Sequence, residues 1–213
     1  PESWGEALHA HKLATRESDR HLNFWITEWG FSSEKPWGEE DQAKRVFKGI
    51  ATILGTGIAK KVGYALLKDE PRIADELEEA IKELSGWQPP EEGTASSAWD
   101  EKARNIMKRF FREWAKFGLF REDRSPKPAA ESYRIITSAL TQRFSNGNHL
   151  FLLEFNHPIT YYGFSNAKGR VLTLWNEETD LEQEGSVTVS GAPGNSVACY
   201  TYLGERTSLK FSQ

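Results

Sequence analysis

The residues most able to do chemistry lie at the end of one short aromatic segment. Asn23 to Gly30 reads Asn-Phe-Trp-Ile-Thr-Glu-Trp-Gly, an apolar run that stops at Glu28, Trp29 and Gly30. Its aromatic and β-branched residues predict a buried strand. A carboxylate at the end of such a strand is costly to bury unless it is paired or opens into a cleft. Glu28 is therefore a candidate catalytic residue, and a solvated glutamate is the simpler alternative.

A helix and a second strand follow, and they indicate how Glu28 is positioned. Glu39 to Gly55 predicts an amphipathic helix, and Ile58 to Leu67 predicts a strand that runs into Lys68, Asp69 and Glu70. Strand, helix and strand in this order predict a right-handed crossover with a parallel sheet. Because ligands of parallel sheets bind at the carboxyl ends of the strands, both strand ends are expected to form one site.

Several segments, taken in order, resemble a known enzyme family. They are Trp25 to Gly30, Gln42-Ala43, Val62 to Asp69, Phe117 to Phe120 and Asp123 to Ala129. Together they resemble the last two strand-helix units of the clan A type of retaining (β/α)8-barrel glycoside hydrolases. The resemblance covers about residues 20–140. It implies the carboxy-terminal part of a glycosidase domain.

The resemblance also implies roles for individual residues. Glu28 would be the nucleophile at the tip of the seventh barrel strand. Trp29 and Trp37 would stack on sugar rings. Lys68 and Asp69 would hydrogen-bond sugar hydroxyl groups, and a surface ion pair is an alternative for these two residues.

One part of the family's machinery is missing from the chain. Such enzymes need a general acid/base glutamate at the fourth strand, and this chain has room for about two of the eight strands. Glu70, Glu122 and Asp123 are present, but none ends an aromatic strand. We therefore expect the chain to be inactive alone. The missing amino-terminal half of the barrel, or a partner chain, would cover the open sheet edges.

Two helices are predicted between the second strand and the last barrel helix, which spans Ala129 to Leu140. They span Ile73 to Leu84 and Trp99 to Phe117. As an insertion at the carboxyl end of the sheet they would form a subsite wall, or they would be a packed hairpin without ligand contact. The acidic residues of the first of these helices indicate a solvated face rather than a cation site.

From Asn146 the pattern changes to short strands with a period of two residues. The strands are predicted at Leu150 to Phe155, Thr160 to Phe164, Arg170 to Trp175, Ser186 to Ser190, Ser196 to Tyr202 and Thr207 to Phe211. They suggest a small antiparallel β-sandwich, so we predict domains at 1–142 and 143–213. The fold class is α/β plus all-β. Tyr161, Tyr162 and Trp175 are expected in the core or between the two domains. Stacking on sugars would instead make the sandwich a non-catalytic carbohydrate-binding module.

Composition excludes several other classes of function. The formal net charge of the 213 residues is −4, with Lys and Arg interspersed among acids, which disfavours nucleic-acid binding. No apolar run approaches the length of a membrane span. Cys199 is the only cysteine, and His9 and His11 point apart on a helix, so we expect no disulfide, metal site or cofactor. The sequence does not predict a cellular location.

Overall fold

The computed structural model describes residues 24–72, 75–76, 79–80, 97–141, 144–145, 152–155, 159–167, 169–176, 187–190 and 198–207. The helices with bounds among these residues are α2 (Gly38–Gly55), α4 (Ser97–Ala115) and α5 (Pro128–Leu140). Residues 71–72, 75–76 and 79–80 are helical as well. The strands are β1 (Phe24–Trp29), β2 (Ala59–Tyr64), β3 (Phe144–Ser145), β4 (Leu152–Phe155), β5 (Ile159–Asn166), β6 (Gly169–Asn176), β7 (Val187–Ser190), β8 (Cys199–Tyr200) and β9 (Arg206–Thr207). The helix expected to carry His9 and His11 lies outside the described residues.

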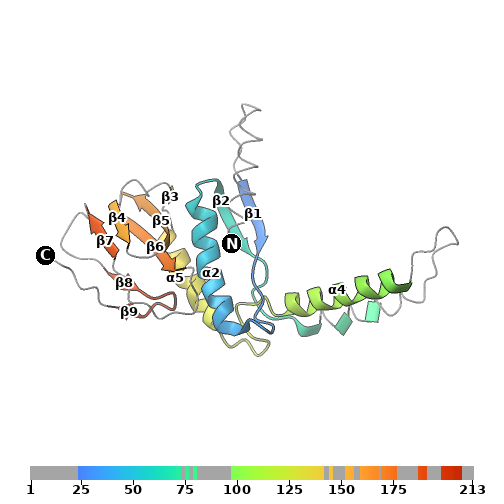
Figure 1. Ribbon diagram of the computed structural model, residues 1–213. Coiled ribbons are helices and arrows are strands. Elements are labelled where there is room, and N and C mark those ends of the chain that lie inside the picture. The colour runs from blue at the N-terminus through green and yellow to red at the C-terminus, as the bar shows by residue number, and fades with distance from the viewer. Residues whose placement is uncertain are drawn as a thin grey trace, which may run out of the picture.

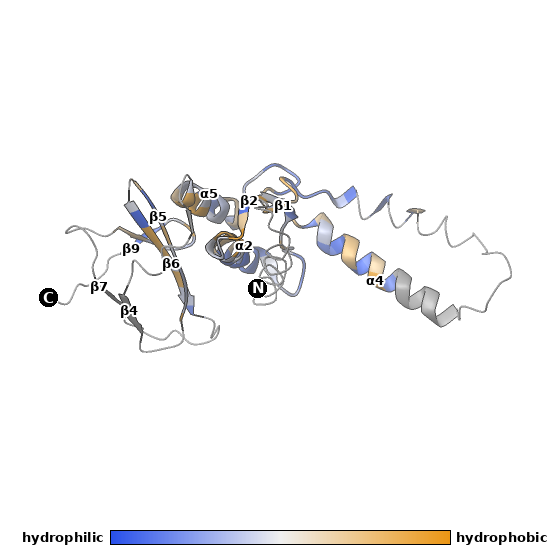
Figure 2. Ribbon diagram, turned by 90° about the horizontal axis from the view of Figure 1, so that it is seen from above, coloured by the Kyte–Doolittle hydropathy of each residue, from blue (hydrophilic) through white to orange (hydrophobic). Residues whose placement is uncertain are grey.

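β1 and β2 form a two-stranded parallel sheet, as the sequence predicted. The helix between them, α2, begins at Gly38, one residue before the predicted start, and ends at the predicted Gly55. Its apolar face carries Ala43, Val46, Ile50 and Ile53, each no more than 1% exposed, in the core cluster with Ile136 and Leu140 of α5. The two helices lie side by side on one side of the sheet (Figures 1 and 2). Burial of this face stabilises the unit that carries the end of β1.

The second strand is shorter than predicted. β2 ends at Tyr64, whereas the strand was predicted to span Ile58 to Leu67. The chain then turns to a different partner, because the backbone N–H groups of Leu119 and Phe120 donate to the Leu67 carbonyl at 3.0 Å each. Lys68 forms a single parallel bridge with Phe120. The end of the sheet is therefore built by the segment before α5 as well as by β1 and β2.

The carboxy-terminal strands pair in antiparallel fashion in three small sheets: β3-β5-β6, β4-β7 and β8-β9. The hairpin of β5 and β6 extends over the full length of both strands. It packs on the helices: a Cβ added to Gly55 of α2 would lie 2.2 Å from the Tyr162 ring, and Phe164 is fully buried. β3 was not predicted, and the predicted strand to Phe211 lies beyond the described residues after Thr207.

The architecture is a mixture of helices and small sheets. Within the described residues the strands form no closed barrel. α4 begins two residues before its predicted start and projects away from α2 and α5 in both ribbon views (Figures 1 and 2). None of the helices in the described part is long and apolar enough to cross a membrane.

Candidate functional site

Glu28 lies at a register shift near the end of β1. From Ile26 to Trp29 β1 advances three residues, while its partner β2 advances two, from Val62 to Tyr64. The extra residue breaks the alternation of the strand, so Thr27 and Glu28 are both exposed and Trp29 is buried. A bulge of this kind re-aims a side chain at the end of a strand. Ile26 packs on the core below the sheet, whereas Glu28 is open to solvent.

The bulge fits closely against the neighbouring strand. A Cβ added to Gly63 of β2 would lie 2.6 Å from the backbone oxygen of Thr27. Only glycine leaves room for this approach of the two backbones. Gly63 thus sets the position of the residue directly before Glu28.

Trp29 is a core residue. It is 6% exposed, and its ring occupies the space beside Gly49 of α2, where an added Cβ would lie 1.9 Å from the indole. Phe31 and Tyr64 make edge contacts with it at centroid distances of 5.2 and 5.8 Å. The predicted stacking role required an exposed ring face. In this structure Trp29 instead anchors the end of β1 to the helix layer.

Asp69 is buried in an ion pair. Its carboxylate accepts hydrogen bonds from the Lys127 ammonium at 2.6 Å and from the Gly118 backbone N–H at 3.0 Å. The side chains of Lys127 and Asp69 are 1% and 4% exposed. Burial lowers the pKa of the Lys127 ammonium, while Asp69 opposes that shift. The surface ion pair considered for Asp69 is therefore a buried one, and it ties the end of β2 to the segment before α5.

The same ammonium also holds the loop after β1. Lys127 Nζ donates to the Ser33 hydroxyl at 2.9 Å and to the Lys116 carbonyl at 3.2 Å. The sequence prediction missed Lys127 as a residue of this region. The available signal was a lysine between Pro126 and Pro128 at the start of a helix, where the amino-terminal helix charge makes a cation unfavourable unless it has an acidic partner.

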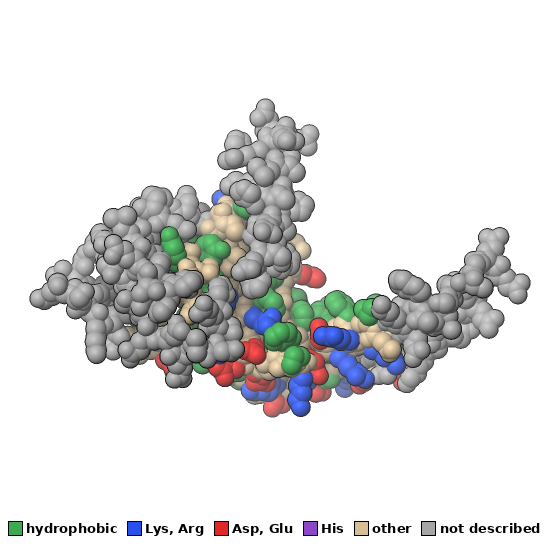
Figure 3. Space-filling view, viewed as in Figure 1, with side chains coloured by type: hydrophobic (Ala, Val, Ile, Leu, Met, Phe, Trp, Pro, Cys, Tyr) green, Lys and Arg blue, Asp and Glu red, His purple; other side chains and the backbone are tan. Residues whose placement is uncertain are grey.

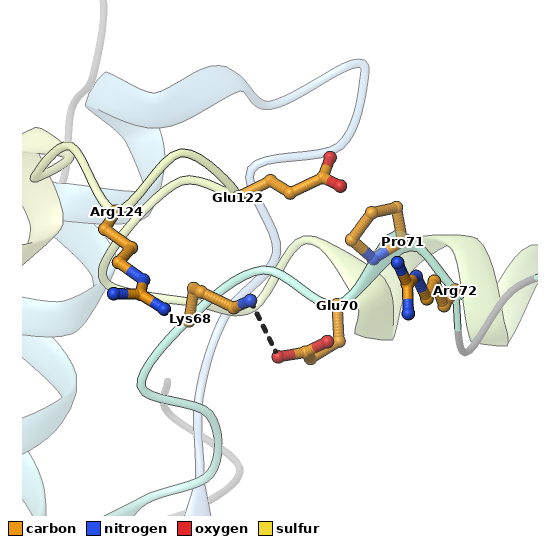
Figure 4. Close-up of a pocket in the computed structure, with 6 residues that line it drawn as sticks. All are labelled: Lys68, Glu70, Pro71, Arg72, Glu122 and Arg124. Carbon is orange, nitrogen blue, oxygen red and sulfur yellow. Dashed lines mark ion pairs between the residues drawn. The ribbon is translucent and has the colours of Figure 1, made fainter.

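Lys68 lines an open polar pocket of about 290 Å³ at the carboxyl end of β2 (Figure 4). Its ammonium lies 3.3 Å from the Glu70 carboxylate. The lining residues are Lys68, Glu70, Pro71, Arg72, Glu122 and Arg124. The structure thus brings Lys68 to this pocket, but Glu28, Trp29, Trp37 and Asp69 do not line it.

Trp37 is exposed on the loop before α2. Its side chain is 45% exposed, and the Arg45 guanidinium lies over its ring at 3.8 Å from the centroid. One ring face is thus covered by a cation. The exposed part of the ring is compatible with the predicted stacking on a sugar, and this role is taken up under the proposed function.

Gln42 and Tyr64 form a buried polar centre beneath these loops that the sequence did not reveal. The Gln42 amide group donates to the carbonyl of Phe31 at 2.7 Å and approaches that of Gly118 at 3.2 Å. Gln42 Oε1 is buried without a partner among the described residues. Burial raises the pKa of Tyr64 to about 12. These groups hold the loop after β1 against the loop after α4.

The carboxy-terminal aromatics contact the rest of the protein. Tyr162 and Trp175 pack together with a centroid distance of 5.9 Å, and Lys48 of α2 lies 5.9 Å from the Trp175 ring. This packing favours the expected core role over sugar stacking.

Among the described residues no group of His, Cys, Asp and Glu side chains could hold a metal ion.

Comparison with known proteins supports a glycoside hydrolase-like fold. No family model and no curated protein matches the chain. A solved family 39 glycoside hydrolase from the gut symbiont Bacteroides cellulosilyticus WH2 is similar, with a TM-score of 0.58 and 16% sequence identity. The similarity covers 98% of this chain and 34% of that chain, so the chain spans about a third of the length of that structure.

Proposed function

We propose that this chain is the part of a retaining glycoside hydrolase domain that carries the nucleophile, Glu28. The observation that carries the proposal is the bulge in β1, which exposes Glu28 at the carboxyl end of a parallel sheet and away from the buried helix layer. Ligands of parallel sheets bind at that end. The glycoside hydrolase-like fold supports the same assignment.

In this mechanism the Glu28 carboxylate attacks the anomeric carbon and forms a covalent glycosyl ester as the bond to the leaving group breaks. A second carboxyl group, about 5–5.5 Å away, protonates the leaving oxygen and then activates the water that hydrolyses the ester. No carboxyl group of this chain is assigned the acid/base role. The chain alone is accordingly expected to be inactive on ordinary aryl glycosides.

The remaining predicted residues divide into two kinds. Lys68 and Trp37 are exposed enough to contact a sugar, through a hydroxyl group and a ring face respectively. Asp69 and Trp29 are buried, so we assign them to positioning the two strand ends. The contacts proposed for Lys68 and Trp37 fit a sugar, which offers both hydroxyl groups and an apolar ring face.

The acid/base is proposed to come from a polypeptide that also pairs with the outer edges of β1 and β2, which pair with no third strand within the part of the chain that the structure describes. A two-stranded parallel sheet exposes unpaired backbone groups on its outer edges. An amino-terminal half-barrel, or a partner chain equivalent to it, would satisfy them.

The experiment is complementation with such an amino-terminal half, taken from the upstream reading frame. We expect turnover of an aryl glycoside only when both parts are present, and a loss of at least about a thousandfold in the Glu28→Ala variant. Azide should restore activity to Glu28→Ala by replacing the nucleophile, giving a glycosyl azide of inverted configuration. A solvated surface glutamate is the competing assignment, and unchanged turnover in Glu28→Ala would establish it.

A matched control separates chemistry from folding. Glu34→Ala removes an acidic side chain on the loop after β1 that has no assigned role and should retain turnover. Turnover by the chain alone that Glu28→Gln abolishes would contradict the assignment of the acid/base to another polypeptide.

A further inference from the structure

The polar pocket at the carboxyl end of β2 carries more positive than negative charge. Three of its lining side chains are cations, Lys68, Arg72 and Arg124, and two are carboxylates, Glu70 and Glu122. In the close-up, Arg72 and Arg124 lie on opposite sides of the ion pair that Lys68 forms with Glu70 (Figure 4). Because Lys68 already balances Glu70, the two guanidinium groups are opposed by a single further carboxylate among the lining residues. An anionic group that enters the pocket is therefore attracted.

The two guanidinium groups are available to a ligand. Arg72 and Arg124 are both exposed, and neither side chain forms an ion pair with any residue that the structure describes. Arginine carries five N–H donors in a planar fork that matches the oxygens of a carboxylate or a similar oxyanion. Glu122 is also exposed, and its carboxylate is an acceptor for hydroxyl donors. The lining thus offers donors for an oxyanion and an acceptor for hydroxyl groups, in a space of about 290 Å³.

The backbone conformation of Arg124 supports a role for its side chain. Its φ angle of 69° lies in the left-handed region, which favours glycine and strains residues that have a Cβ atom. Hydrogen bonds of the surrounding turn fix this conformation. The Arg124 N–H donates to the Arg121 carbonyl at 2.9 Å, and the Arg121 N–H donates to the Ser125 carbonyl at 2.8 Å. Because glycine would fit here with less strain, we expect the Arg124 guanidinium to make a contact that glycine cannot make.

Two segments build the pocket at the end of the sheet that carries Glu28. Lys68 forms a parallel bridge with Phe120, and the Asp69 N–H donates to the Phe120 carbonyl at 2.9 Å. Since β1 and β2 are parallel, Glu28 and the segment after β2 belong to the same end of the sheet. In the space-filling view, charged side chains of both signs gather along the lower edge, toward which β1 points in the ribbon view (Figures 1 and 3). The pocket thus lies at the end of the sheet where ligands of parallel sheets bind.

We propose that this pocket is a subsite for a carboxylate or sulfate group carried by the saccharide on which Glu28 acts. This inference rests on the proposed function and adds the class of substrate. Arg72 and Arg124 bind the oxyanion, and the Glu122 carboxylate accepts hydrogen bonds from hydroxyl groups of the same saccharide. Inorganic sulfate has no hydroxyl donor and is repelled by Glu122, so the lining favours a charged sugar over a free anion.

The first test is binding by the chain itself, measured by NMR titration at constant ionic strength. The probes are methyl β-D-glucuronide, methyl β-D-glucoside sulfated at its primary hydroxyl group, the neutral methyl β-D-glucoside and sodium sulfate. Because the contacts are exposed to solvent, we expect weak binding that added salt weakens further.

At least one of the two charged sugars should bind about tenfold more tightly than the neutral sugar and than sulfate. The charged sugar that binds more tightly identifies the substituent. Equal affinity for charged and neutral sugars overturns the proposal. Sulfate that binds as tightly as the charged sugars assigns the pocket to free anions, which also overturns it.

Two variants and a control separate contact with the ligand from folding. Arg124→Gly should weaken binding of the charged sugar by about threefold or more, because one of two charge-assisted contacts is lost. Its midpoint of urea denaturation should stay the same or rise, because glycine relaxes the backbone at this position. Arg72→Ala should weaken binding to a similar extent. Arg206→Ala removes an exposed arginine that does not line the pocket and should bind as the wild type does. Unchanged binding in both pocket variants, or equal weakening in Arg206→Ala, overturns the proposal.

Turnover by the complemented enzyme distinguishes a failure of this proposal from a failure of the function proposed for Glu28. The substrates are an aryl β-D-glucuronide or its sulfated counterpart and the matching neutral aryl β-D-glucoside. We expect a higher kcat/KM for the charged substrate, and Arg124→Gly should remove this preference through KM with little change in kcat. If turnover requires Glu28 but Arg124→Gly leaves the preference unchanged, the subsite is wrong. If the preference depends on Arg124 but Glu28→Ala retains turnover, the subsite stands and the nucleophile is wrong.

Discussion

Glu28 lies near the end of β1, Asp69 follows the end of the neighbouring parallel strand β2, and the surroundings of the two carboxylates are opposite. Glu28 is exposed beside a bulge of β1. Asp69 is 3% exposed and paired with Lys127 at 2.6 Å. The difference teaches that a carboxylate at a strand end is not functional by position alone. Where a buried cation is supplied, the carboxylate becomes a structural tie, and where the strand turns it outward, it stays available for chemistry.

The largest effect on stability is expected from Asp69→Ala. The change leaves the Lys127 ammonium buried without its partner, which should lower the free energy of unfolding by about 3–5 kcal/mol. The matched change Glu28→Ala, at the exposed strand end, should alter it by less than about 0.5 kcal/mol. Urea denaturation measures both. Equal losses in the two variants would contradict the contrast between the strand ends.

Alkaline pH should weaken the buried side of the site through Tyr64. Burial raises the pKa of Tyr64 to about 12, while an unfolded tyrosine titrates near its ordinary value of 10.0. Between these values the folded state holds the proton and the unfolded state does not, so stability is full below about pH 10 and falls as pH rises toward about 12. The loss should be about 2–3 kcal/mol at most, from about 1.4 kcal/mol per pKa unit.

Denaturation at several alkaline pH values checks this expectation. Tyr64→Phe should remove the loss assigned to the hydroxyl, and Tyr200→Phe, at a side chain that is 56% exposed, should not. An identical alkaline profile in Tyr64→Phe and the wild type would show that Tyr64 is not the responsible group.

Gly63→Ala should disturb the exposed side of the site. The added Cβ would meet the Thr27 backbone oxygen at 2.6 Å, so the bulge before Glu28 has to shift. We expect a loss of about 2 kcal/mol in unfolding free energy and, in the complemented enzyme, a lower kcat. The control is Ala65→Gly, the reverse exchange of the same two residue types two positions further along the chain. If Gly63→Ala retained its stability and kcat, Gly63 would not be needed to form the bulge that positions Glu28.

A smaller effect than that of Gly63→Ala is expected from Trp37→Ala. Loss of the contact with Arg45 should lower the stability by about 0.5–1 kcal/mol, typical of an exposed cation–π pair. In the complemented enzyme KM should rise while kcat changes little. Trp25→Ala removes a comparable contact, with Lys61 at 4.2 Å, but away from the strand ends, and should leave KM unchanged. A KM effect in both variants would show that Trp37 has no special role.

The sequence was sufficient to predict α2, α5, the hairpin of β5 and β6, and the parallel pairing of β1 and β2. Periodicity gave α2 and α5 to within one residue, and alternation gave the hairpin around Gly169. The helices and the hairpin depend on neighbouring residues in the chain, and the parallel pairing follows from the order strand, helix, strand. They could therefore be read without any knowledge of long-range contacts.

The contacts that define the strand ends could not be predicted in the same way. Asp69 and Lys127 are 58 positions apart, and the residues next to either one do not indicate that the two side chains pair. The burial of Trp29 depends on the space beside Gly49 in α2, and the bulge at Thr27 depends on Gly63 in β2. Each is a packing relation between distant segments. The sequence therefore indicated Glu28, Trp29 and Asp69 but neither their division into buried and exposed groups nor the part played by Lys127.

The most direct test of the account is covalent trapping of the nucleophile. A 2-deoxy-2-fluoroglycoside with an activated leaving group slows the second step of a retaining reaction, so the glycosyl ester accumulates on the attacking carboxylate. After digestion of the complemented enzyme, mass spectrometry should find the sugar on the peptide containing Glu28 and on no other carboxylate of this chain. A label on Asp69, or a label elsewhere with an unmodified Glu28, would contradict the assignment.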